Sequence, residues 1–124
     1  MLKVLLIEDD STTVEAIQLC FEIHRPGAII VAAVKGLEGI KVFRSEAPDV
    51  VIIDLGLDDI DGMEVLREIR HSSDVPILIV SAKDEPESVA QAMELGADDY
   101  LIKPFDIRDL FARLDNAMHR DHVS

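Results

Sequence analysis

Residues 3–10 read KVLLIEDD, an apolar run of strand type that ends at three consecutive acids. Three later stretches repeat this arrangement, with an apolar run followed at once by a polar residue: VVIID (50–54), ILIVS (77–81) and YLIK (100–103). Runs this continuous are typical of parallel strands covered on both faces. In one parallel sheet, their polar ends would gather at the carboxyl edge. We therefore expect Glu8, Asp9, Asp54, Ser81 and Lys103 to lie close together.

Helix-like segments alternate with these runs and with a fifth apolar run, Ile29–Ala33. Apolar residues recur at helical spacing in five groups: Val14, Ile17 and Phe21; Ile40 and Phe43; Met63, Leu66 and Ile69; Val89, Met93 and Leu95; Leu110, Leu114 and Ala117. Right-handed crossovers and short connections restrict such an alternation to a doubly wound parallel sheet. The expected fold class is therefore α/β, with five βα units in one domain.

Capping and turn residues support these boundaries. Asp10 or Ser11 is suited to cap the first helix, and Asp61 to open the third. Pro86 fits a first helical turn, and Gly96 fits a helix end in the left-handed conformation.

The composition limits the functions that the chain can have. Its 124 residues, 48% of them hydrophobic, suffice for one domain with its own core. Twenty-five acids against twelve bases give a formal net charge of -13, so we expect no direct nucleic-acid binding by this domain. One cysteine, Cys20, cannot form an internal disulfide and favours a reducing compartment. No apolar stretch approaches the ~20 residues of a membrane span. We expect a cytoplasmic location and no membrane partner.

The acids at the sheet edge predict a divalent metal site. Ligand sites of doubly wound sheets lie where the strand order reverses, which for the order 2-1-3-4-5 is between the first and third strands. Asp9 and Asp54 offer the hard oxygen ligands that Mg²⁺ prefers, and Glu8 can hold the ion through water. The backbone carbonyl of Gly56 is a further expected ligand.

The same edge suits phosphoryl transfer. A carboxylate such as Asp54 can attack a phosphoryl group and form an acyl phosphate. The metal and the Lys103 ammonium would neutralise charge on the transferring oxygens. The Ser81 hydroxyl can donate to the bound phosphoryl group.

Each of these residues taken alone also has a purely structural interpretation. Residues 8–10 can be a solvated loop with a helix cap, Asp54 a turn residue, Ser81 a cap and Lys103 a surface lysine. Their occurrence at the same end of successive strands is what favours one site.

At this point the chain resembles the receiver domain of bacterial two-component response regulators, over Met1 to about His119. Six stretches carry the resemblance: KVLLIEDD (3–10), DVVIIDL (49–55), DGM (61–63), PILIVSA (76–82), GADDY (96–100) and KPF (103–105). The resemblance implies a flavodoxin-like sheet with the strand order 2-1-3-4-5.

It also implies a role for each residue of the site. Asp54 matches the phosphoacceptor, and Glu8 and Asp9 match the acidic pair around Mg²⁺. Ser81 and Tyr100 match the switch hydroxyl and switch aromatic residue, with Tyr100 filling the space that Ser81 leaves on phosphorylation. Lys103 matches the family lysine, whose bond to the following proline is often cis. The implied partner is a sensor histidine kinase or phosphotransfer protein, and the only reactions catalysed are the domain's own phosphorylation and dephosphorylation.

Two departures from the family pattern affect the expected partners. Asp58 stands where the family usually has proline, and it belongs to an acidic loop. The charges of this loop are either simply solvated, or they weaken the docking of an acidic phosphodonor. The C-terminal region resembles receivers of the winged-helix DNA-binding subfamily, which dimerise through intersubunit salt bridges. Gln91 and Asp115 replace two basic residues of that interface, while Arg113 and an Asp of 98–99 are retained. We therefore expect at most a weak phosphorylation-dependent homodimer through residues 87–113.

Domain limits and two rival functions complete the predictions. Residues 1–120 are expected to form the receiver domain and residues 121–124 a tail or the start of a linker. One rival is a phosphohydrolase with an aspartyl intermediate, but Gly56 stands where such enzymes have a second catalytic acid. The other is a degenerate receiver that serves only as an interaction module, against which the complete set of site residues argues.

Overall fold

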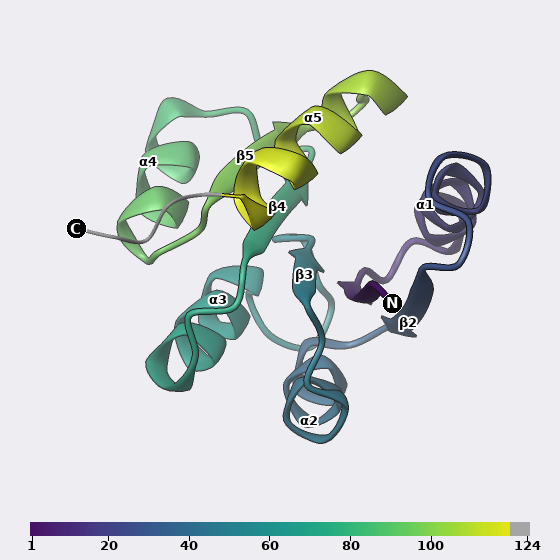
Figure 1. Ribbon diagram of the computed structural model, residues 1–124. Helices are drawn as coiled ribbons and strands as arrows, with labels where there is room; N and C mark the ends of the chain where they lie inside the picture. The colour runs from purple at the N-terminus through teal and green to yellow at the C-terminus, as the bar shows by residue number, and fades with distance from the viewer. Residues whose placement is uncertain (120–124) are drawn as a thin grey trace.

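The computed structural model describes residues 1–119, in which five strands alternate with five helices (Figure 1). The strands are β1 (Lys3–Ile7), β2 (Ile29–Ala33), β3 (Val50–Ile53), β4 (Ile77–Ser81) and β5 (Asp99–Ile102). The helices are α1 (Ser11–His24), α2 (Gly36–Glu46), α3 (Gly62–Ser72), α4 (Pro86–Glu94) and α5 (Ile107–Met118). The predicted alternation of five βα units is confirmed.

All strands are parallel and form one sheet in the order β2-β1-β3-β4-β5, as the resemblance implied. The register aligns the strand ends, since Ile7 pairs with Ile53 and Ile53 pairs with Ile79. The residues that directly follow β1 and β3 therefore meet at one edge. The backbone N–H of Asp54, for example, donates to the Ile7 carbonyl at 3.0 Å.

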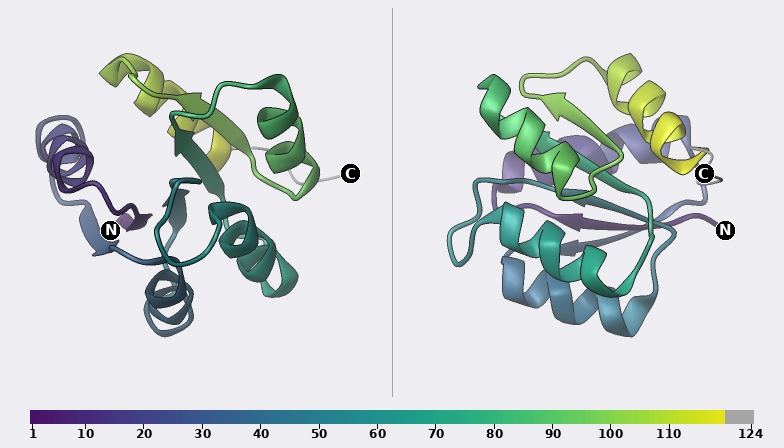
Figure 2. Two further views of the ribbon diagram at one scale, coloured as in Figure 1. Left: turned by 180° about the vertical axis from the view of Figure 1, so that it is seen from behind. Right: turned by 90° about the vertical axis from the view of Figure 1, so that its left-hand side faces the viewer.

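Helices cover both faces of the sheet (Figure 2). Alternate strand residues point to opposite faces, so Leu5 and Ile7 contribute to one core and Val4 and Leu6 to the other. The first core is completed by α2, α3 and α4, and the second by α1 and α5. This double coverage explains why the central strands consist of apolar residues almost without interruption.

The expectation that the apolar runs are covered on both faces was wrong at the sheet margin. The run Ile29–Ala33 forms the edge strand β2, and Ile29 is 43% exposed because no further strand or helix covers it. In α4, Met93 recurs at helical spacing with Val89 and Leu95 but is 40% exposed. Cys20 is partly buried against the α1–α5 core rather than fully enclosed.

The helix boundaries follow the predicted capping residues. The side chain of Asp10 accepts from the backbone N–H of Thr12 and caps α1, and Asp61 caps α3 through Met63. Pro86 occupies the first turn of α4, and Gly96 has a φ of +106° just beyond that helix. None of the helices within residues 1–119 combines the length and apolar character that a membrane crossing requires.

Candidate functional site

The structure brings the five predicted edge residues together. Glu8 and Asp9 directly follow β1, and Asp54 directly follows β3. Ser81 is the last residue of β4, and Lys103 directly follows β5. The backbone N–H of Lys103 donates to the Ser81 carbonyl at 2.8 Å, which ties the ends of β4 and β5 to one another.

Three carboxylates form the acidic part of the site. One oxygen each from Glu8, Asp9 and Asp54 lies within 4.8 Å of the others. Glu8 is 2% exposed and Asp54 is 7% exposed, whereas Asp9 is half-buried. Buried carboxylates this close repel one another when ionised, so the arrangement favours a bound cation.

The Lys103 ammonium brings a positive charge to this acidic site. Its Nζ lies 2.6 Å from Glu8 Oε1 and 3.9 Å from Asp54 Oδ2. The other Glu8 oxygen, Oε2, accepts from the backbone N–H of Asp10 at 3.2 Å. The ammonium thus forms a close ion pair with Glu8 while staying within reach of Asp54. The Lys103–Pro104 peptide bond is cis, as the resemblance implied.

The electrostatic environment raises the pKa of two of the acids. Burial raises the pKa of Glu8 to about 7, with Asp54 adding to the rise and the Lys103 ammonium opposing it. Burial also raises the pKa of Asp9, and the carboxylates of Asp58 and Asp54 raise it further. Asp58 therefore contributes negative charge to this site, which the sequence left open.

The loop after β3 holds Asp54 tightly. Gly56 N–H donates to Asp54 Oδ1 at 3.2 Å. A Cβ at Gly62 would overlap the carbonyl oxygen of Asp54 and the Cα of Leu55, so α3 approaches this backbone through a residue without a Cβ. The carbonyl of Gly56 as a metal ligand stays a prediction.

The two other acids of this loop have structural partners. Asp59 accepts from the backbone N–H groups of Gly36 at 2.8 Å and Leu37 at 3.0 Å, at the start of α2. Asp61 caps α3. Both side chains are exposed, but they connect the loop to the helices instead of being simply solvated. The sequence could not reveal the role of Asp59, because its partners lie more than twenty residues earlier in the chain.

Ser81 and Tyr100 lie on neighbouring strands. Ser81 is buried, and its Oγ accepts from the Lys83 backbone N–H at 3.2 Å. The Tyr100 ring is buried in the core beneath α4, and its hydroxyl donates to the Lys83 carbonyl at 2.7 Å. Both residues thus hold the loop that joins β4 to α4. The resemblance implied that the Tyr100 ring fills the space that Ser81 leaves on phosphorylation, and this movement stays a prediction.

A groove of about 520 Å³ adjoins the site between α1 and the loop after β5. Lys103 lines it together with mainly small and apolar residues: Thr12, Thr13, Ala16, Cys20, Ala82, Pro104, Phe105 and Ile107. Nothing in the sequence pattern pointed to this groove, since only the topology brings the start of α1 beside the start of α5.

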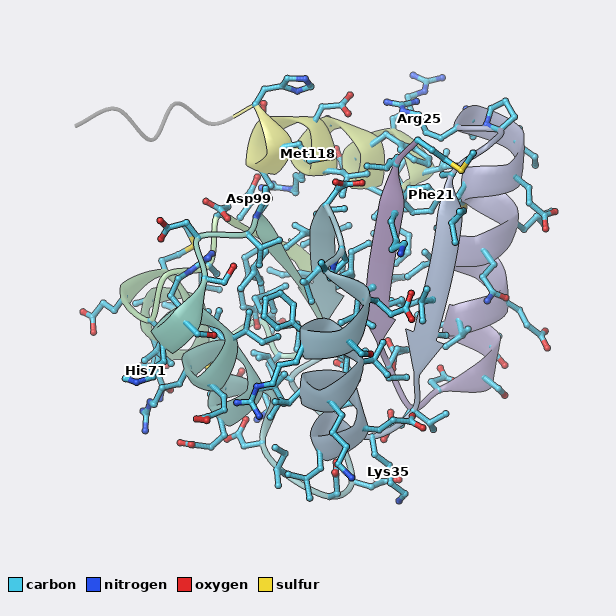
Figure 3. All side chains as sticks on the ribbon, turned by 60° about the horizontal axis from the view of Figure 1, so that its bottom comes forward. Phe21, Arg25, Lys35, His71, Asp99 and Met118 are labelled. Atoms are coloured by element: carbon cyan, nitrogen blue, oxygen red, sulfur yellow. The ribbon has the colours of Figure 1, made fainter. Side chains whose placement is uncertain are left out.

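The retained dimerisation residues have partners within the same chain. Arg113 Nη1 lies 2.8 Å from Asp99 Oδ1. The side chain of Asp98 is 2% exposed and pairs with Arg70 at 3.2 Å. Asp115 receives two hydrogen bonds from Arg25, whose guanidinium also lies over the Phe111 ring at 4.7 Å. Figure 3 shows Arg25 at the end of α1, beside α5.

The doubly wound sheet and the acid-rich edge with its lysine and hydroxyl define a receiver-type signalling domain. The family model of the response regulator receiver domain matches residues 4–115, and the chain belongs to this family.

Comparison with individual proteins agrees with this assignment. The chain is 40% identical over 117 residues to the transcriptional regulatory protein CseB of Streptomyces coelicolor, covering 94% of this chain and 49% of CseB. It is 38% identical over 120 residues to the transcriptional regulatory protein AfsQ1 of the same organism, covering 97% of this chain and 52% of AfsQ1. The chain therefore spans about half the length of these curated relatives. The crystal structure of a response regulator receiver domain protein from Clostridium thermocellum superposes with a TM-score of 0.87 at 32% identity, covering 97% and 96% of the two chains.

Proposed function

We propose that Asp54 accepts a phosphoryl group from a phosphohistidine in a Mg²⁺-dependent reaction, and that the resulting charge switches the conformation of the domain. The observation that carries this proposal is the position of Asp54: one of its carboxylate oxygens lies within 4.8 Å of oxygens of Glu8 and Asp9, and its Oδ2 lies 3.9 Å from the Lys103 ammonium. The chain belongs to the response regulator receiver family, whose members serve two-component signalling.

The donor set fits Mg²⁺. The ion prefers oxygen ligands and keeps several waters, so it is typically bound by a few carboxylates. Asp9 and Asp54 would hold it directly and Glu8 through water, with the Gly56 carbonyl as a further ligand. A bound ion would neutralise charge on the phosphoryl oxygens.

The chain's own residues account for the remaining parts of the transfer. An Asp54 oxygen forms a bond to phosphorus while the P–N bond of the donor breaks and its electron pair goes to the imidazole. Lys103 is near enough to pair with the new phosphoryl oxygens, at the cost of its contact with Glu8. Ser81 lies at the end of the adjacent strand, where its hydroxyl can donate to the same group.

A protein donor has to approach this edge from the open side. The groove beside Lys103 has a volume of about 520 Å³ and a mainly apolar lining next to the acceptor. We infer that a histidine kinase or phosphotransfer protein covers it during transfer. The phosphorylation-dependent homodimer through residues 87–113, the cytoplasmic location and the domain boundary at residue 120 remain predictions. Residues 121–124 lie outside the described part of the chain.

Labelling with acetyl phosphate tests the acceptor. We expect Asp54→Asn to abolish acid-labile phosphate incorporation, because the amide oxygen is a poor nucleophile, while Asp58→Asn in the same loop still labels. Omitting Mg²⁺ should reduce labelling of the parent protein by at least about tenfold. Equal labelling of Asp54→Asn and the parent would reject Asp54 as the acceptor. A parent that does not label would favour a degenerate receiver, and turnover of phosphate esters would favour the phosphohydrolase.

A further inference from the structure

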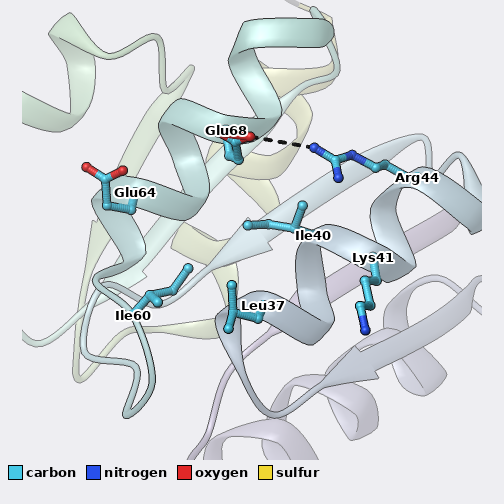
Figure 4. A pocket seen from close by; sticks show the side chains of 7 residues that line it. All are labelled: Leu37, Ile40, Lys41, Arg44, Ile60, Glu64 and Glu68. Carbon is cyan, nitrogen blue, oxygen red and sulfur yellow. Dashed lines mark ion pairs between the residues drawn. The ribbon is translucent and has the colours of Figure 1, made fainter.

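A second groove runs between α2 and α3, with a volume of about 490 Å³ (Figure 4). Its floor is apolar and consists of Leu37, Ile40 and Ile60. Leu37 is 57% exposed although it is a large apolar side chain. Leu37 thus leaves apolar surface open to solvent beside the buried Ile40 and the half-buried Ile60.

The two walls of this groove carry opposite charges. Lys41 and Arg44 stand on the α2 wall, and Glu64 and Glu68 on the α3 wall. Arg44 Nη2 lies 3.6 Å from Glu68 Oε1 across the groove. Lys41 and Glu64 point away from one another toward the outer rims (Figure 4).

These residues form three levels along the groove. The first is apolar, since α2 begins at Gly36, where a Cβ would lie 2.6 Å from Ile60 Cγ1, and Leu37 follows directly. The third level is fixed by the Arg44–Glu68 pair. Lys41 and Glu64 lie about one helical turn before this pair on their respective helices and form the second level. The second and third levels thus join one residue of α2 to one of α3, and the first joins Leu37 of α2 to Ile60 of the loop before α3.

We propose that this groove binds the same groove of a second copy of the chain, around a two-fold axis parallel to the two helices. Such an axis exchanges the walls but keeps the levels, so α2 of one copy faces α3 of the other. Lys41 then lies opposite Glu64 of the second copy, and Leu37 lies opposite Ile60 of the second copy. The interface is isologous, and each contact occurs twice.

Charge complementarity favours a second copy as the occupant. A partner segment of uniform charge would attract one wall of the groove and repel the other. A two-fold axis perpendicular to the helices would place the basic α2 wall of one copy against the basic α2 wall of the other. A second copy presents one basic and one acidic wall, so its charges match both walls of this groove. The net charge of -13 opposes association, so the dimer is weak, and it requires no phosphorylation.

Sedimentation equilibrium of the unphosphorylated chain at rising concentration and 0.15 M salt tests this proposal. Lys41→Glu and Glu64→Lys should each weaken dimerisation by about tenfold or more, because each reversal turns two attractive contacts of the dimer into repulsive ones. The double variant Lys41→Glu/Glu64→Lys should recover to within about threefold of the parent, since its charges are again complementary. Arg108→Glu, which changes the net charge in the same way as Lys41→Glu but at an exposed residue of α5, is the control and should leave the dimer unchanged.

Three results would overturn the proposal. The first is a parent that stays monomeric at all concentrations, which would assign the groove to a different occupant. The second is a dimer that Arg113→Ala abolishes and Lys41→Glu does not, which would assign association to residues 87–113. The third is a double variant as weak as the single ones. All substituted side chains are exposed or half-buried, and circular dichroism melting verifies that each variant is folded.

Discussion

Glu8 is the residue whose ionisation is most sensitive to its surroundings. Its pKa in the folded protein is about 7, whereas the ordinary value is 4.5, and burial is the main cause. Between pH 4.5 and about pH 7, the Glu8 carboxyl keeps its proton in the folded protein but has lost it in the unfolded chain. The contribution of Glu8 to stability is therefore complete below pH 4.5 and is lost as the pH rises through 7.

We expect a corresponding pH dependence in the absence of divalent metal. In EDTA, the free energy of unfolding of the parent should fall by on the order of 2 kcal/mol between pH 5 and pH 7.5, and Glu8→Gln should remove most of this decrease. Urea denaturation at constant ionic strength measures it. The lowered pKa values of Asp10 and Asp59 place their titration below 3.8, outside this window. Glu15 is exposed on α1, and Glu15→Gln is the control. If Glu15→Gln changed the pH dependence of the free energy of unfolding as much as Glu8→Gln, its assignment to Glu8 would be wrong.

At the scale of elements, Arg70 joins the end of α3 to the beginnings of β4 and β5. Its guanidinium donates to the carbonyls of Ser73 and Val75, to the Gly96 carbonyl from two nitrogens, and to Asp98 Oδ2. Asp98 also accepts from the Ile77 backbone N–H at 2.8 Å. One planar group with several fixed donors thus satisfies backbone carbonyls in two connections, α3–β4 and α4–β5.

Arg70→Ala should therefore lower the free energy of unfolding by about 3 kcal/mol, since it leaves partly buried backbone acceptors and the buried Asp98 carboxylate without this partner. Arg70→Lys should recover only a part, because a single ammonium cannot reach all of these carbonyls. Arg67→Ala, on the same helix with an exposed pair to Glu64, is the matched control and should cost less than about 1 kcal/mol. Chemical denaturation compares them, and similar losses for Arg67→Ala and Arg70→Ala would refute the role of Arg70.

The elements that the sequence predicted best are those whose signal is local. The strands β1, β3 and β4 are continuous apolar runs, and the caps Asp10 and Asp61 act on residues two positions away. Long-range partners have no such signal. The pairing of Arg70 with Asp98 and of Arg25 with Asp115 depends on how helices pack on the sheet. The exposure of β2 depends on its position at the edge, which its apolar sequence does not distinguish from a central strand.

For the candidate site, the sequence likewise predicted which residues meet but not how their side chains pair. The ends of parallel strands share an edge, so the meeting of Glu8, Asp54 and Lys103 was predictable once the strands were placed. The 2.6 Å pairing of Lys103 with Glu8 rather than with Asp54 was not, because it depends on side-chain geometry. The added charge of Asp58 beside Asp9 was not predictable either, since it depends on the path of the loop after β3.

At the scale of the whole molecule, the net charge of -13 and the buried acids both disfavour the folded state without a counter-ion. A cation that binds only the folded form at Glu8, Asp9 and Asp54 stabilises the whole domain by mass action. Mg²⁺ at ten times its dissociation constant should add about 1.4 kcal/mol, or roughly 5 °C in Tm for a domain of this size. Differential scanning calorimetry with and without Mg²⁺ measures the shift.

Asp9→Asn should remove most of this shift in Tm by deleting a direct ligand, while Asp10→Asn keeps the helix cap and should retain the shift. Because nonspecific screening would act alike on both variants, an equal shift in Asp9→Asn and Asp10→Asn would mean that the acidic edge does not bind the ion.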